Sequence, residues 1–123
     1  MAHSARTAIV DEWYRTELKK AAPSLIAKWE PLLGVKVERF FVQKMKTKWG
    51  SCNAESKSIR LNTELTKKPA ECLDYVIVHE MAHLIVRHHD ERFTSLMDRH
   101  LPNWKLIRQT LNAAPLAHTD WAY

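Results

Sequence analysis

The segment His79-Glu80-Met81-Ala82-His83 holds the residues best suited to chemistry, and His89 follows six positions after its end. Histidines four positions apart on a helix project from the same face, one turn apart. That spacing suits two ligands of one zinc ion, and a third histidine leaves a fourth position open for water. A glutamate beside the first histidine is placed to take a proton from that water. The segment therefore predicts one zinc ion per chain and hydrolysis, most simply of a peptide bond.

The residues around this segment are apolar on nearly every side of the helix that would carry it. Tyr75-Val76-Ile77-Val78 precedes the segment and Leu84-Ile85-Val86 follows it, which predicts a central, buried helix. Polar side chains buried there without partners would each cost about 1–3 kcal/mol. A metal ion removes much of that cost. The alternative is that these are core histidines bonded to neighbouring protein groups.

The third metal ligand is specified less tightly than the first two. His89 fits a spacing in which the chain turns after the helix and returns a histidine to the metal, and Asp90 would then cap the next helix. We predict His79, His83 and His89 as metal ligands and Glu80 as the general base. The other side chains that could complete the ligand set are His88, His100, His118 and Glu91.

Length and composition indicate one globular domain over residues 1–123, with a loose tail over 115–123. The 123 residues are 46% hydrophobic and 27% charged, as in ordinary globular proteins. Cys52 and Cys72 form no C-x-x-C pair, which favours reduced thiols and a cytoplasmic location. No apolar run approaches the roughly 20 residues that span a bilayer. The net charge of +5 permits nucleic acid as a partner, although the basic residues are dispersed.

The apolar periodicity predicts helices on both sides of a β-rich region. We expect a helix over 5–22 capped by Ser4, a kink or new start at Pro23, and an end at Gly34. Ile9, Val10, Trp13 and Leu32 are among the apolar residues expected on its buried face. The motif helix is expected from Pro69 to about Arg87. Two short helices follow, with ends expected near Pro102 and Pro115.

The region between these helices predicts strands. Residues 35–45 and 58–62 are strand-like, and residues 53–57 form a turn. The expected fold is α+β, with a small antiparallel sheet of about three strands beside the central motif helix and flanking helices. An edge strand bordering the cleft could pair with an extended peptide, which favours a peptide or protein substrate.

Several segments together resemble a known family. They are Lys48-Trp49-Gly50-Ser51-Cys52, Leu61-Asn62, residues 73–83, and His89 with Phe93. Over residues 8–111 the chain resembles the YgjP-like metallopeptidases, and it is more distantly similar to the SprT and WLM zinc peptidases. The resemblance implies a compact zincin-like fold, one zinc held by His79, His83 and His89, and Glu80 as base. Family members usually carry arginine at the position of Lys48 and many are longer at the N-terminus, so substrate selection could differ.

The sequence leaves the supporting roles open. The expected oxyanion donor is one of His88, Arg92, His100 and Tyr75, and the groups that could orient the ligands are Asp74, Asp90, Asn62 and Asp98. Gly50 is expected to permit a close backbone approach to the helix or to a substrate. Trp49 and Cys52 are expected to be structural.

Other classes of function compete with a zinc peptidase. A nucleic-acid-associated protease of SprT or WLM type fits the basic balance of the chain. A non-catalytic zinc-binding module is a further alternative, in which His118 or Asp120 of the tail would fill the fourth zinc position. A metal-dependent ribonuclease fits less well, because Glu80 and the Trp-Gly-Ser-Cys stretch do not resemble that class of enzyme. A deformylase-type hydrolase fits less well because His89 suits the site better than Cys52 or Cys72.

Overall fold

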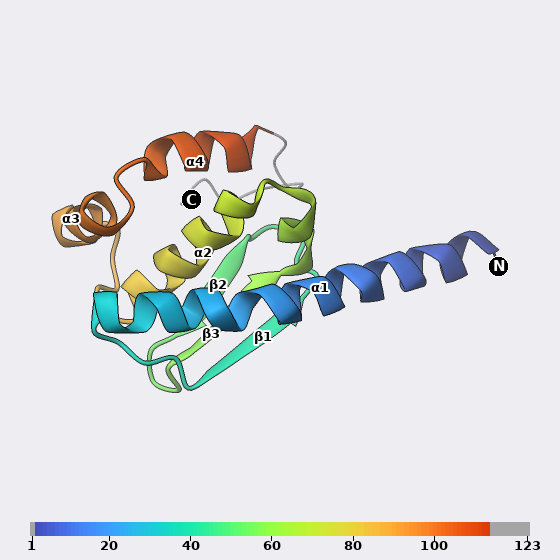
Figure 1. Cartoon of the computed structure of the whole chain (residues 1–123), viewed down its shortest axis with the longest axis horizontal. Helices are drawn as coiled ribbons and strands as arrows, with labels where there is room; N and C mark the ends of the chain where they lie inside the picture. The colour runs from blue at the N-terminus through green and yellow to red at the C-terminus, as the bar shows by residue number, and fades with distance from the viewer. Residues whose placement is uncertain (1, 114–123) are drawn as a thin grey trace.

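The motif segment forms the centre of the structure. The computed structural model describes residues 2–113, with side chains from residue 8 onward. Its elements are α1 (Ala2–Leu33), β1 (Arg39–Gln43), β2 (Gly50–Asn53), β3 (Ser58–Asn62), the 3-10 helix η1 (Thr63–Lys67), α2 (Ala70–His83), α3 (Glu91–His100) and α4 (Trp104–Asn112). Helix α2 packs against α1, β2, β3, α3 and α4, and Figure 1 shows it between the sheet and α4. This is the expected α+β architecture. The tail over 115–123, with His118 and Asp120, lies outside the described residues.

The first helix is longer than expected, and its N-terminal part is more exposed. It begins at Ala2, so Ser4 is not its N-cap, and it continues through Pro23 without a break. Gly34 ends the helix with φ +71°, a conformation that glycine adopts without strain. A buried face runs along its C-terminal half, formed by Leu18, Ala22, Ile26, Trp29 and Leu33. The side chains of Ile9, Val10, Trp13 and Leu32 are exposed instead of buried, because the body of the protein does not cover them.

The sheet is mixed, whereas an antiparallel sheet was expected. Its strand order is β1-β3-β2. β2 and β3 form the expected antiparallel pair, but β1 pairs with β3 in parallel. The segment between β1 and β2 therefore passes the end of β3, so β1 lies on one side of β3 and β2 on the other. β2 is consequently an edge strand, next to α2.

A buried asparagine holds this crossing segment in place. The Asn62 amide donates to the carbonyl oxygens of Met45 (2.9 Å) and Lys48 (2.7 Å). Its oxygen accepts from the backbone N–H groups of Met45 (3.3 Å) and Glu64 (3.0 Å). Asn62 is fully buried, and these bonds of its side-chain amide all go to backbone groups. The expectation that it orients a histidine is therefore wrong.

The helices after the sheet start where expected, but α2 ends early. It stops at His83 instead of about Arg87, and tight bonds from Leu84 to Met81 and from Ile85 to Ala82 close its last turn. Asp90 caps α3 as predicted, accepting from the backbone N–H groups of Arg92 (3.0 Å) and Phe93 (3.3 Å). Among the described residues no helix has the length and apolarity to cross a membrane.

Candidate metal centre and active-site cavity

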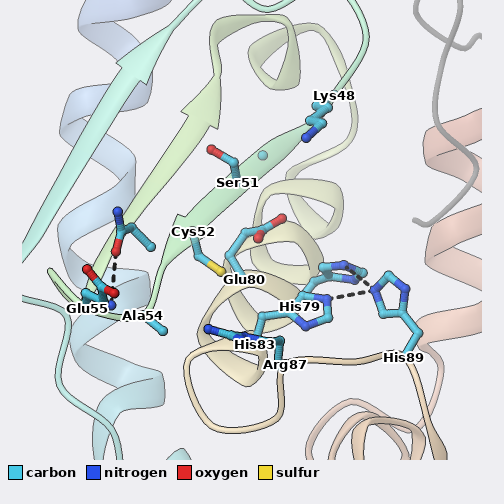
Figure 2. A pocket seen from close by; sticks show the side chains of 12 residues that line it. Lys48, Ser51, Cys52, Ala54, Glu55, His79, Glu80, His83, Arg87 and His89 are labelled. Atoms are coloured by element: carbon cyan, nitrogen blue, oxygen red, sulfur yellow. Dashed lines mark hydrogen bonds between the residues drawn. The ribbon is translucent and has the colours of Figure 1, made fainter.

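Three histidine side chains converge on one point. His79 and His83 project from the last two turns of α2, and His89 comes from the turn between α2 and α3. The Nε2 atoms of His83 and His89 lie 2.7 Å apart, and those of His89 and His79 lie 3.3 Å apart. Figure 2 shows the three rings facing one another at the edge of the cavity. The sequence predicted that these residues meet, and the structure brings them together.

The geometry and protonation of the cluster fit a metal ion. Three nitrogens at about 2.0–2.1 Å from a tetrahedral zinc would lie roughly 3.3 Å from one another. The 3.3 Å separation already matches this value, and the 2.7 Å separation needs a small opening. The Nδ1 of His83 lies 3.0 Å from the carbonyl oxygen of Val86. Because that oxygen only accepts, the Nδ1 carries the proton and the Nε2 presents its lone pair to the cluster.

Burial also favours neutral imidazoles, the form that binds metals. It lowers the pKa of His79 well below the usual value, and the nearby His83, His89 and Arg108 lower it further. The pKa of His83 is lowered as well, mainly by burial, while its hydrogen bond to Val86 opposes that shift. His79 and His83 therefore offer lone pairs near neutral pH.

Glu80 lies next to this cluster and is almost completely buried, at 2% exposure. Burial raises the pKa of its carboxyl to about 8, against the opposing effects of a hydrogen bond from Cys52 and the charge of Lys48. Figure 2 shows Glu80 between Cys52 of β2 and the histidines. A carboxyl with a raised pKa can accept and release a proton near neutral pH.

Gly50 explains how β2 reaches α2 so closely. A Cβ at this position would lie 2.9 Å from Val76 Cγ1, 3.0 Å from the Arg60 carbonyl oxygen and 3.2 Å from Glu80 Cγ. Only a residue without a side chain allows this approach. The expected close approach of Gly50 to the helix is therefore present, and Gly50 also lines the cavity.

The two other residues of this stretch differ in role. Trp49 is buried, as expected of a structural residue. Cys52 is half-buried, lines the cavity and hydrogen-bonds to Glu80, so it is more than an apolar filler. Burial, followed by the charge of Glu80 and this hydrogen bond, raises the pKa of its thiol to about 12.

A cavity of about 600 Å³ opens over these groups. Its lining consists of Lys48, Gly50, Ser51, Cys52, Asn53, Ala54, Glu55, His79, Glu80, His83, Arg87 and His89. One wall is therefore the edge strand β2 with its following turn, and the opposite wall is the end of α2 with the turn that carries His89. This arrangement suits a chain-like substrate laid along β2.

The expected oxyanion donors do not line this cavity. Tyr75 is buried beneath His79, with ring centroids 5.7 Å apart, and His100 packs edge-on against Trp29. Arg92 lines a separate surface groove beside α3. Lys48 and Arg87 are the cationic side chains that reach the cavity. The sequence did not predict this role for either residue, although Lys48 belongs to the Lys48-Trp49-Gly50-Ser51-Cys52 stretch that carries the family resemblance.

Two of the aspartates expected near the metal serve the packing of helices. Asp74 accepts from Trp29 Nε1 (2.6 Å) and Lys28 (3.1 Å), which ties α2 to α1. Asp98 accepts from Trp104 Nε1 (2.7 Å), which ties α3 to α4. Their carboxylates are engaged at helix contacts and not at the histidines.

The fold and the site together define a metal-dependent hydrolase of the peptidase type, and the comparisons agree. The model of the YgjP-like metallopeptidase domain matches residues 2–114, nearly the whole chain, so the protein belongs to that family. It is a metallopeptidase and acts on peptides or proteins. Among proteins of curated function, none matches the chain significantly.

Solved structures show the same fold. The metallopeptidase zymogen of Pyrococcus abyssi abylysin is similar with a TM-score of 0.64 and 20% identity, over 70% of this chain and 87% of that one. The metallopeptidase zymogen of Methanocaldococcus jannaschii jannalysin has a TM-score of 0.58 and 21% identity, over 68% of this chain and 88% of that one. The compact zincin-like fold that the resemblance implied is therefore confirmed.

Proposed function

We propose that His79, His83 and His89 bind one zinc ion and that Glu80 is the general base of peptide hydrolysis. The observation that carries this proposal is the convergence of three Nε2 atoms beside a buried glutamate in an open cavity. Three imidazole nitrogens suit zinc, with one position left open. When bound, zinc would acidify water and polarise the scissile carbonyl. We also propose a single domain over 1–123, because the described elements share one core.

Glu80 moves the proton in this mechanism. Its carboxylate accepts a proton from the water that attacks the scissile carbonyl, and later delivers that proton to the departing amine. One water and one peptide bond are consumed, and one carboxyl and one amine form. In the metal-free protein, burial raises the pKa of this carboxyl to about 8, which brings proton uptake and release close to neutral pH.

The edge strand positions the substrate. Asn62 N–H donates to the Trp49 carbonyl, so alternate residues of β2 from Trp49 onward bond to β3. In that alternation the backbone N–H and C=O of Cys52 point away from β3. An extended peptide pairing with them lies along the cavity beside Glu80. Lys48 and Arg87 are the groups we propose to stabilise the developing oxyanion.

Two expectations remain predictions. Nucleic acid as a further partner would show as salt-sensitive binding of DNA. A cytoplasmic location would show by fractionation of cells. Neither is needed for the peptidase proposal.

The test compares the wild type with Glu80→Gln, and with Glu55→Gln as a matched control in the same cavity. We expect one zinc per chain in all three proteins, measured by elemental analysis. Cleavage of casein should fall by about 10²–10⁴-fold in Glu80→Gln alone, because only that variant loses the base. Wild-type cleavage by Glu80→Gln would remove Glu80 from the mechanism. A wild type that binds no zinc would remove the metal assignment.

A further inference from the structure

Phe93 contacts all three histidines of the cluster. It is the third residue of α3 and is 4% exposed. Its ring stacks on His83 with centroids 4.5 Å apart and an interplanar angle of 18°. It meets His79 at 5.0 Å and His89 at 4.8 Å, both edge-on. These contacts give the three imidazoles one shared neighbour.

The position of Phe93 is itself fixed by the local fold. Its backbone N–H donates to Asp90 Oδ1 at 3.3 Å, in the cap of α3. His89 directly precedes that cap, so the turn, the cap and the ring form one unit. The Nδ1 bond of His83 to Val86 holds the other end of the same turn.

The chemistry of the ring suits this place. A benzyl ring has no hydrogen-bond donor or acceptor, so it does not compete with a metal ion for the imidazole nitrogens. The nitrogens are therefore left to face the cavity. An imidazole bound to a metal cation also carries more positive charge, which increases its attraction to an aromatic ring.

We propose that Phe93 is a positioning residue of the metal centre, which holds the three imidazole rings so that their Nε2 atoms aim at one point. This inference rests on the proposed ligand set. It predicts that loss of the ring weakens metal binding even where the protein remains folded.

The experiment measures the zinc Kd of folded protein by competition with a chromophoric chelator. Phe93→Leu is compared with Phe40→Leu, the same change in β1, the strand on the far side of the sheet from β2. We expect the Kd to rise on the order of tenfold in Phe93→Leu, as for other groups that orient metal ligands. Phe40→Leu should stay within about twofold of the wild type, because β1 lies at the opposite edge of the sheet from β2, the strand that lines the cavity. Phe93→Met, whose unbranched side chain adapts more readily to the space left by the ring, provides the same measurement if Phe93→Leu does not fold.

A second readout separates positioning from stability. Cobalt(II) replaces zinc and reports ligand geometry through its visible absorption bands. These bands should change in Phe93→Leu or Phe93→Met and stay unchanged in Phe40→Leu. A wild-type Kd and spectrum in both Phe93 variants would overturn the inference, as would an equal loss of affinity in Phe40→Leu. Absence of zinc binding by the wild type would instead overturn the proposed ligand set.

Discussion

At the scale of single residues, Glu80 shows how one environment serves catalysis at the expense of stability. Its carboxyl is 2% exposed, and burial raises its pKa from an ordinary value near 4.5 to about 8. A carboxyl whose pKa is raised towards neutral pH can take up and release a proton during the reaction. The same burial disfavours the folded state whenever the group must ionise.

The metal-free protein should therefore show a pH-dependent penalty from Glu80. Because the folded pKa is raised, the stability contributed by the protonated group is fully present below pH 4.5 and is lost as the pH rises through about 8. A glutamine side chain at this position stays neutral throughout. In the presence of a chelator, Glu80→Gln should match the Tm of the wild type near pH 4.5 and exceed it by about 5 °C or more above pH 8. The histidines are common to both proteins, so their titration cancels in the difference.

Thermal unfolding followed by circular dichroism across pH 4.5–9 checks this prediction. Leu73→Met, a change of similar volume in the same helix, serves as a control and should show no such divergence. A constant difference in Tm between Glu80→Gln and the wild type would contradict the burial account.

At the scale of elements, the contact between β2 and α2 shapes the cavity. Gly50→Ala would place a methyl group 3.0 Å from the Arg60 carbonyl oxygen, which belongs to β3 and cannot move aside. We expect a loss of about 1–3 kcal/mol in unfolding free energy, measured with urea. Cleavage should fall further than zinc content, because β2 shifts away from Glu80 while the histidines stay on α2 and its following turn.

Gly34→Ala is the matched control for that change. Its added methyl group meets nothing within 4 Å, but the φ of +71° is strained for alanine. It should lower stability by roughly 1 kcal/mol and leave cleavage per folded molecule unchanged. Equal losses of cleavage in the two variants would show that β2 does not position the substrate.

The elements also show what the sequence could and could not predict. Local signals predicted α2, the cap of α3 at Asp90 and the β2–β3 pair, because caps, turns and apolar periods act over a few residues. The parallel placement of β1 depends on the Asn62 amide and a segment many positions away, which no local signal contains. The end of α2 at His83 has no glycine or proline to mark it. In the site, the helix period predicted His79 and His83, and the spacing after the helix predicted His89. Lys48, Arg87 and Cys52 enter the site only because β2 meets α2 in three dimensions.

The crossing segment gives a prediction at this scale. Asn62→Ala leaves backbone groups of Met45, Lys48 and Glu64 without the amide that binds them. We therefore expect the free energy of unfolding to fall by about 3 kcal/mol. Asn53→Ala removes an exposed amide that bonds to Glu55 and Ser56, and should lower stability by roughly 1 kcal/mol or less. Urea unfolding compares the two. A smaller effect at Asn62 than at Asn53 would mean that other contacts set the strand order.

At the scale of the whole molecule, the metal site and the core share one helix. Ten of the residues of α2 are buried, His79 and Glu80 among them, and α2 packs against α1, the sheet, α3 and α4. The N-terminal part of α1 extends beyond this body, as Figure 1 shows, and exposes Ile9, Val10 and Trp13. Metal binding should therefore stabilise α2 and the elements packed against it, and should leave the N-terminal extension of α1 unaffected.

This coupling predicts that zinc stabilises the molecule as a whole. A ligand that binds only the folded state adds RT ln(1 + [L]/Kd), about 4 kcal/mol at a thousandfold excess over Kd. We expect saturating zinc to raise the Tm by about 10 °C or more and a chelator to reverse the change. His83→Ala should lose this response, whereas His100→Ala, whose ring packs against Trp29 away from the cluster, should keep it. Hydrogen exchange should slow across α2 and α3 but not over residues 2–13. Protection confined to the turn after His83 would mean that the metal orders only a local segment, and the proposed link between site and core would then fail.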